Sequence, residues 1–266
     1  SKWAKPIGGG KFKDWTQFLI DASNELNDDK LKHQVQELVK DHEYLFASQL
    51  LKNKLEHNWE KVTQSAFGQK AEPSELHKAI VQLRPRVIIT TNFDRLIETA
   101  WDSQNSTDHT YPKVISKIDP NVFKLFRDDY NYIIKIHGSI EDIDSMIFDK
   151  ATYQTGAFGN QYYKDLISSL LLTHTFLFIG FSMTDPAISS IVEMYAHSFP
   201  GMRPHYILQS GEADEIDELW KKHRKLSLIR YKIDNEHKEL ADIVRELASA
   251  AAIRRKELIA AGLPAN

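Results

Sequence analysis

The chain has 266 residues and a formal net charge of −3, so its overall charge gives no indication of nucleic-acid binding. It contains no cysteine, which excludes disulfides, a cysteine-ligated zinc site and a thiol nucleophile, and is compatible with a cytoplasmic protein. No apolar run approaches the ~20 residues that a membrane-spanning helix needs, and we therefore expect no membrane segment.

Residues 14–84 are expected to form a helical block that precedes the first clear strand. Asp14 is suited to cap the first helix, and apolar residues follow it at helical spacing. The same pattern continues over residues 29–55, which we expect to form one helix or two. Ser74 is expected to cap another helix, which Pro85 would end.

From residue 86 onward, strands alternate with helices. Short apolar runs predict strands at residues 86–90, 113–116, 132–136, 175–179, 205–209 and 226–232. Helical patterns are found at residues 93–103, 158–173 and 212–224, and after Asp185-Pro186. This alternation predicts an α/β fold with a Rossmann-like parallel sheet and helices on both faces. We expect one domain over residues 1–266, with its core at 86–235 and a helical segment at 236–266.

Three of the predicted strands end in polar or glycine-rich residues. These motifs are Thr91-Asn92-Phe93-Asp94, His137-Gly138-Ser139 and the run from Gly180-Phe181-Ser182 to Asp185-Pro186. The carboxyl ends of parallel strands lie at one edge of a sheet, where open α/β folds bind their ligands. We therefore expect the three motifs to build one site.

In this order, each after a strand, the three motifs resemble those of the sirtuin-like NAD-cleaving domains of bacterial anti-phage defence systems. The Asn-x-Asp and His-Gly motifs are shared with sirtuin deacylases, whereas Gly-Phe-Ser-x-x-Asp-Pro is more similar to the defence branch. The resemblance implies an NAD hydrolase that releases nicotinamide and ADP-ribose without a metal and depletes NAD to abort phage infection. It also implies a homo-oligomer, or a partner sensor or motor ATPase, because such an enzyme must be kept inactive until it is triggered.

The family's phosphate-binding motif is a Gly-Ala-Gly-x-Ser loop after its first strand. Ser1 resembles the last residue of this loop, which makes it an expected cofactor contact. The glycines of the loop and the strand before them are then absent from this sequence. Gly8, Gly9 and Gly10 are a weak candidate for a phosphate loop, because no strand precedes them.

Asn92 and His137 are the expected catalytic residues. Cleavage of the bond between nicotinamide and ribose passes through a state that resembles an oxocarbenium ion, and the leaving group is already cationic. The amide of Asn92 can bind a ribose hydroxyl or the attacking water, although an isolated Asn at this place would more often cap the next helix. His137, with an ordinary pKa near ~6.5, is suited to act as general base or ribose partner, and the glycine after it permits close approach of a ligand.

The resemblance assigns further cofactor contacts to Thr91, Gly138, Gly180 and Ser182. Asp94 is expected either to accept a hydrogen bond from the nicotinamide amide or to favour the first turn of its own helix. Asp185 is a candidate for binding the adenosine ribose, with the capping of its own helix as the preferred interpretation. Tyr153 and Phe158 are expected to lie in the core rather than to stack on a cofactor.

Two other functions stay open. The first is NAD-dependent protein deacylation, against which the absence of cysteine argues, because sirtuin deacylases place their acyl-lysine cleft beside a small zinc-bound domain. The second is a non-catalytic scaffold subunit that binds NAD or ADP-ribose. We expect no direct nucleic-acid contact, because the basic run at residues 221–225 is typical of a solvated helix face. The acidic run at residues 141–144 is expected to be a solvated turn.

Overall fold

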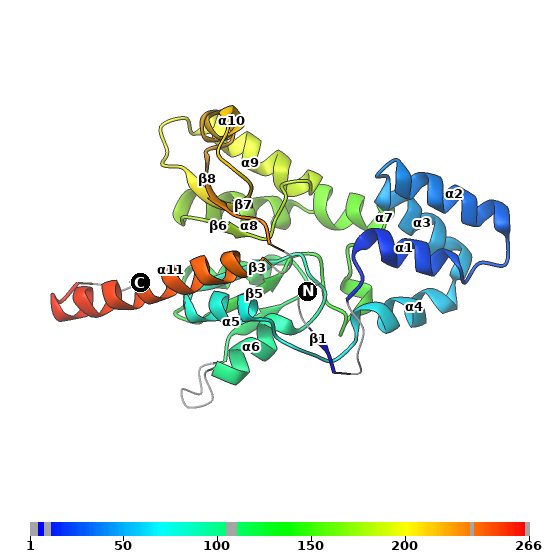
Figure 1. Cartoon of the computed structure of the whole chain (residues 1–266), viewed down its shortest axis with the longest axis horizontal. Helices are drawn as coiled ribbons and strands as arrows, with labels where there is room; N and C mark the ends of the chain where they lie inside the picture. Colours follow the sequence, from blue (N-terminus) through cyan, green and yellow to red (C-terminus); the bar gives the residue numbers. More distant parts are fainter. Residues whose placement is uncertain (1–4, 8–11, 105–110, 235–236, 264–266) are drawn as a thin grey trace. The chain divides into compact units, whose positions relative to one another are not determined.

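The computed structural model describes residues 5–7, 12–104, 111–234 and 237–263 (Figure 1). The chain forms two compact units, Ser1–Gly159 and Asn160–Ala265, and each contains a three-stranded parallel sheet. The boundary falls inside the predicted core of residues 86–235, whose organisation as one domain stays a prediction. No described helix is both long enough and apolar enough to cross a membrane.

Helices make up most of the first unit before its sheet: α1 (Trp15–Ser23), α2 (Asp29–Lys40), α3 (Tyr44–Leu55), α4 (His57–Phe67) and α5 (Glu75–Gln82). The predicted cap at Asp14 is confirmed, since its carboxylate accepts a hydrogen bond of 2.8 Å from the backbone N–H of Gln17. The stretch predicted as one helix or two forms α2 and α3, which separate near His42, where φ is 61°. α4 is not predicted from the sequence, because its buried face combines one tryptophan with a threonine and an alanine.

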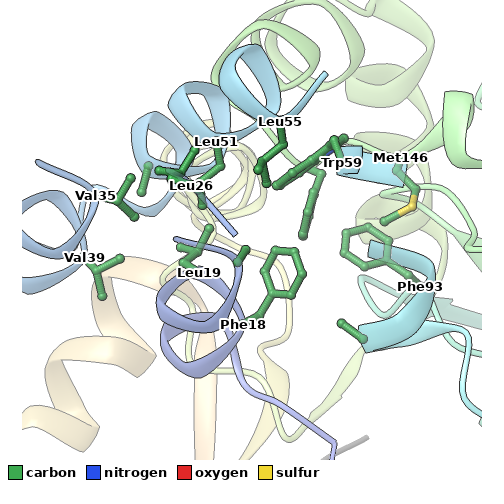
Figure 2. Close-up of a cluster of buried hydrophobic side chains, with 14 of the residues drawn as sticks. Phe18, Leu19, Leu26, Val35, Val39, Leu51, Leu55, Trp59, Phe93 and Met146 are labelled. Carbon is green, nitrogen blue, oxygen red and sulfur yellow. The ribbon is translucent and has the colours of Figure 1, made fainter. Parts of the chain in front are cut away.

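The helices of this unit share a hydrophobic core with the loops that follow its strands. Phe18 of α1 and Trp59 of α4 pack in this core, and Figure 2 shows their side chains together with that of Phe93. Phe148 connects the helices to the turn after the first strand of the sheet, because its ring centroid lies 5.4 Å from that of Trp59 and 5.2 Å from that of Phe93. Burial of one such side chain stabilises a fold by about 1.5–3 kcal/mol. The helices therefore support the segment that carries the first polar motif.

The sheet of the first unit contains β3 (Val87–Thr90), β5 (Tyr132–Lys135) and β4 (Lys113–Ile115), in this spatial order and all parallel. α5 and α6 (Leu96–Gln104) pack against it through a cluster that includes Val81, Ile97 and Ile133. The remaining elements are short: the antiparallel pair β1 (Lys5–Pro6) and β2 (Ala71–Glu72), the 3-10 helices η1 (Pro120–Phe126) and η2 (Ile143–Ser145), α7 (Lys150–Tyr153) and the π-helical turn η3 (Gln154–Phe158).

The second unit also alternates strands with helices. Its parallel sheet has the order β6 (Leu177–Ile179), β7 (His205–Ser210) and β8 (Leu226–Tyr231). Its helices are α8 (Gln161–Thr173), α9 (Pro186–Ser198), α10 (Glu215–Arg224) and α11 (Lys238–Ala260). α8 packs on α9, α9 on α10, and α10 on β8. Parallel strands connected through helices in both units confirm the predicted α/β class.

Candidate active site

The two expected catalytic residues follow neighbouring strands that end level with each other. Thr90 at the end of β3 pairs with Lys135 at the end of β5, and the N–H of Ile136 donates to the Thr90 carbonyl over 3.0 Å. Asn92 and His137 each stand two residues beyond that pair. Neighbouring strands lie about 4.8 Å apart. Both residues therefore leave the sheet at the same carboxyl edge, on adjacent strands.

The turn after β3 exposes its polar residue and buries its aromatic one. Asn92 is exposed, and its backbone N–H donates to the hydroxyl of Thr90 over 3.1 Å. Phe93 is buried, its ring lies against Phe148, and its carbonyl accepts a hydrogen bond of 3.0 Å from the N–H of Ile140. The half-buried Thr91 belongs to the same turn. Because packing and hydrogen bonds fix the backbone on both sides, the Asn92 amide is presented to solvent from a defined place.

Asp94 has a structural partner in its own helix. Its Oδ1 accepts a hydrogen bond of 2.9 Å from the backbone N–H of Leu96, at the start of α6. This contact agrees with the alternative that the acid favours the first turn of its helix. Binding of the nicotinamide amide by Asp94 stays a prediction.

His137 lies in a closely packed segment at the end of β5. The residue is 7% exposed, and its ring meets the ring of Tyr153 edge to face, with centroids 5.9 Å apart. Gly138 has φ of 86°, and a Cβ added there would lie 2.2 Å from the carbonyl oxygen of Ser145. The chain's own backbone thus requires a glycine at this position, whether or not a ligand also approaches it.

The two aromatic residues beside this segment differ in burial. Tyr153 is 3% exposed, so its predicted place in the core is confirmed. The prediction for Phe158 is wrong, because it is 41% exposed; its ring meets the Tyr153 ring edge to face, with centroids 5.3 Å apart.

Three charged or titratable residues near the first motif are not predicted from the sequence as part of the site. Lys135, fully buried, donates from Nζ to the carbonyl of Asp94 and lies 3.0 Å from Oε1 of Glu98 in α6. His77 of α5 is also buried, and its Nδ1 accepts a hydrogen bond of 3.2 Å from the backbone N–H of Ser74. A lysine inside an isoleucine run and a histidine three residues after a helix cap are the signals that could have identified two of them.

Burial lowers the pKa of His77 from 6.5 to about 4, because the charged imidazolium loses its hydration inside the protein. The carboxylate of Asp94 acts in the opposite direction and raises this pKa. His77 is therefore within electrostatic range of the first motif and is uncharged at neutral pH.

The third motif belongs to the second unit. Gly180 follows β6 with φ of 63° and is exposed, as is Ser182, whose hydroxyl lies 2.7 Å from that of Thr184. Asp185 caps α9, since its Oδ1 accepts a hydrogen bond of 2.9 Å from the N–H of Ile188. This cap is the interpretation preferred from the sequence. Contacts of Gly180, Ser182 and Asp185 with a ligand stay predictions.

Ser1 and Gly8 to Gly10 lie outside the described residues. Within the described part of the first unit, two hollows of about 390 Å³ and 460 Å³ lie along α4. Neither is lined by Asn92 or His137. The larger is bordered by Glu60 and by the exposed acidic residues of the run at 141–144, which is the solvated turn that was predicted. No group of three His, Cys, Asp or Glu side chains in the described ranges could hold a metal ion.

Comparison with known proteins identifies relatives of this chain. The "NAD(+) hydrolase ThsA" of Bacillus cereus (strain MSX-D12) is 32% identical over 155 residues, which cover 58% of this chain and 31% of that protein. The protein of the same name from Enterococcus faecium is 28% identical over 209 residues, with 68% and 41% covered. "Defense-associated sirtuin 2" of Bacillus subtilis is 24% identical over 154 residues, with 56% and 15% covered.

The matched regions of the chain cover less than half the length of each of these curated relatives. The profile of one protein family matches residues 86–229, which is more than half of the chain and includes all three motifs. The chain therefore belongs to the SIR2-like domain family.

Proposed function

We propose that this chain is an NAD hydrolase, which cleaves the bond between nicotinamide and ribose to give nicotinamide and ADP-ribose. The observation that carries the proposal is the level pairing of Thr90 with Lys135, from which Asn92 and His137 follow at one edge of the sheet. Membership of the SIR2-like domain family supports it, as do relatives that are themselves named NAD(+) hydrolases.

The proposed reaction needs a positioned nucleophile more than an acid. Nicotinamide leaves as a neutral molecule from a cationic pyridinium, and the ribose carbon passes through a state like an oxocarbenium ion. In our proposal the Asn92 amide orients a ribose hydroxyl or the attacking water. The imidazole of His137 accepts a proton as water adds to the ribose carbon and then returns it to solvent. Thr91, Asp94 and Gly138 line the nicotinamide and ribose side of the proposed site.

The remaining proposed contacts come from the second unit and from Ser1. The exposed hydroxyl of Ser182 is suited to a phosphate or ribose oxygen, and Gly180 leaves room for a ligand beside the backbone. We propose that Asp185 adds a ribose contact, and that Ser1 contacts the phosphates.

In the cell, we propose that the protein depletes NAD as a cytoplasmic effector of antiviral defence and so aborts infection. The name of one relative, "Defense-associated sirtuin 2", supports the defence role. Unrestrained loss of NAD would harm the host, so the activity requires control by homo-oligomerisation or by a partner sensor or motor ATPase. The exposed faces of the helices before residue 84 and of α11 are the surfaces proposed for this assembly.

The purified protein incubated with NAD alone tests the proposed activity. Release of nicotinamide and ADP-ribose without any acceptor is the expected result, measured by chromatography. Release that depends on an added acyl-lysine peptide would instead establish a deacylase. NAD binding with no release would establish a binding module. Either of these two results would overturn the proposal.

A further inference from the structure

A buried lysine connects three elements beneath the first motif. Lys135 is the last residue of β5, between Ile134 and Ile136, and its side chain is fully buried. Its Nζ donates to the backbone carbonyl of Asp94 and lies 3.0 Å from Oε1 of Glu98, whose side chain is 7% exposed. One ammonium group thus holds together β5, the turn after β3 and the first helical turns of α6.

This ion pair is poorly explained by stability alone. Removing a lysine and a glutamate from water costs several kcal/mol each, and apolar residues of similar volume are often as stable. The second carboxylate oxygen of Glu98 is buried without a hydrogen-bond partner in the described part of the structure, which adds to that cost. The geometry that the pair imposes offers a better reason for its presence.

We propose that Lys135 and Glu98 are positioning residues, which fix the turn containing Asn92 relative to His137. Lys135 precedes His137 by two residues, and the carbonyl that it binds belongs to Asp94, two residues after Asn92. The pair therefore connects the segments of both expected catalytic groups through one ammonium. The consequence for catalysis rests on the proposed NAD cleavage, in which a misplacement of about 1 Å can lower the rate by about 100-fold.

The other anchors of the turn act at different points. The Phe93 ring packs into the core, and the N–H of Asn92 donates to the Thr90 hydroxyl. The contact from Lys135 holds the end of the turn, where Asp94 leads into α6. Glu98 in turn binds the ammonium of Lys135. Loss of the Glu98 carboxylate therefore weakens the contact between Lys135 and the Asp94 carbonyl, although Glu98 is not itself a proposed ligand contact.

The double variant K135M/E98L tests the pair, because it replaces both charges together with apolar side chains of similar length and leaves no buried charge alone. Its kcat for nicotinamide release is expected to fall by about 10- to 100-fold, with KM changed by less than about three-fold. Amide hydrogen exchange at Asn92 and Leu96 is expected to become faster. K113M is the matched control: its ammonium, 3.1 Å from Asp128, lies at the amino end of the same sheet, and both readouts should stay unchanged.

A double variant with unchanged kcat and unchanged exchange in the turn would overturn the inference. If wild-type protein releases no nicotinamide, the proposed function fails, and the exchange data still decide whether the pair holds the turn. If the double variant does not fold, E98Q and E98L serve in its place. E98Q, which keeps an oxygen acceptor for Lys135, should retain most of the kcat that E98L loses, and equal losses would contradict a positioning role.

Discussion

Gly138 occupies a backbone position that other residues adopt only at a cost. Its φ is 86°, and an added Cβ would lie 2.2 Å from the carbonyl oxygen of Ser145. Replacement by alanine must therefore move the backbone next to His137. We expect G138A to lower the free energy of unfolding by about 2–4 kcal/mol, measured by urea denaturation.

Gly201→Ala provides the control, because a Cβ at Gly201 would meet no atom within 4 Å. Its free energy of unfolding should stay within about 0.5 kcal/mol of wild type. Equal losses in the two variants would contradict the conformational role of Gly138.

His77 makes stability depend on pH. Its pKa is lowered to about 4 in the fold, so between pH 4 and 6.5 the unfolded chain binds more protons at this residue than the folded chain does. The contribution of the neutral imidazole to the free energy of unfolding is therefore present above pH 6.5 and is lost as pH falls towards 4. From pH 7 to pH 5 the loss amounts to about 2 kcal/mol.

H77Q should remove this dependence and keep the helix start, because glutamine at this position can still accept from the Ser74 N–H. Urea unfolding at pH 7 and pH 5 measures the difference. H33Q, at an exposed position of α2, should lose as much stability as wild type on acidification. The role assigned to His77 is wrong if H77Q loses that amount too.

At the scale of elements, α3 and α7 connect the helices to the segment around His137. Lys52 of α3 lies 2.7 Å from the carboxylate of Asp149, whose side chain is 2% exposed, and the Gln49 side chain accepts from the N–H of Ala151 over 2.9 Å. α7 ends at Tyr153, whose ring meets that of His137. The helices thus hold Tyr153 in place, and its ring packs against that of His137.

We expect K52M to lower the free energy of unfolding by about 1–2 kcal/mol, because the buried carboxylate of Asp149 loses its cation while keeping its place at the start of α7. Thermal or urea unfolding provides the measurement. K54M removes a lysine from an exposed position of the same helix and should change stability by less than about 0.5 kcal/mol. A K52M protein as stable as K54M would show that the pair does not hold α7.

The type of each element follows largely from local patterns, but the pairing of elements does not. Strand-end polarity and β-branched runs predict β3, β5 and β6, and Ser74 predicts the start of α5. The contact between Lys52 and Asp149 joins residues 97 positions apart, so no local pattern indicates it. α4 is missed for a related reason, because tertiary packing rather than apolar periodicity defines its buried face.

At the scale of the whole molecule, the sequence predicts parallel strands and helices but not their division into two compact units. Within the first unit, the order β3-β5-β4 depends on contacts between distant residues. The core that the helices share with Phe93 and Phe148 also depends on contacts between distant residues.

The candidate site, too, can be predicted only in part from the sequence. Asn92 and His137 can be proposed because each follows a strand, and the structure adds the register that brings their strands level. Lys135 is visible in the sequence as a charge in an apolar strand, but its partner Glu98 emerges only when α6 is packed on the sheet. Local sequence patterns therefore identify polar groups that follow strand ends better than the buried ion pair that holds them.

Asn92 and His137 are proposed to act together on one ligand, and the rates of nicotinamide release by N92A, H137A and the double variant measure whether they do. N58A and H33A, at exposed positions of α4 and α2, are the matched controls and should retain the wild-type rate. Each single variant should lose about 100-fold or more in kcat, and the double variant should be little slower than the slower single variant. Single variants with wild-type rates, or a double variant whose loss is the product of the single losses, would show that the two residues do not act together on one ligand.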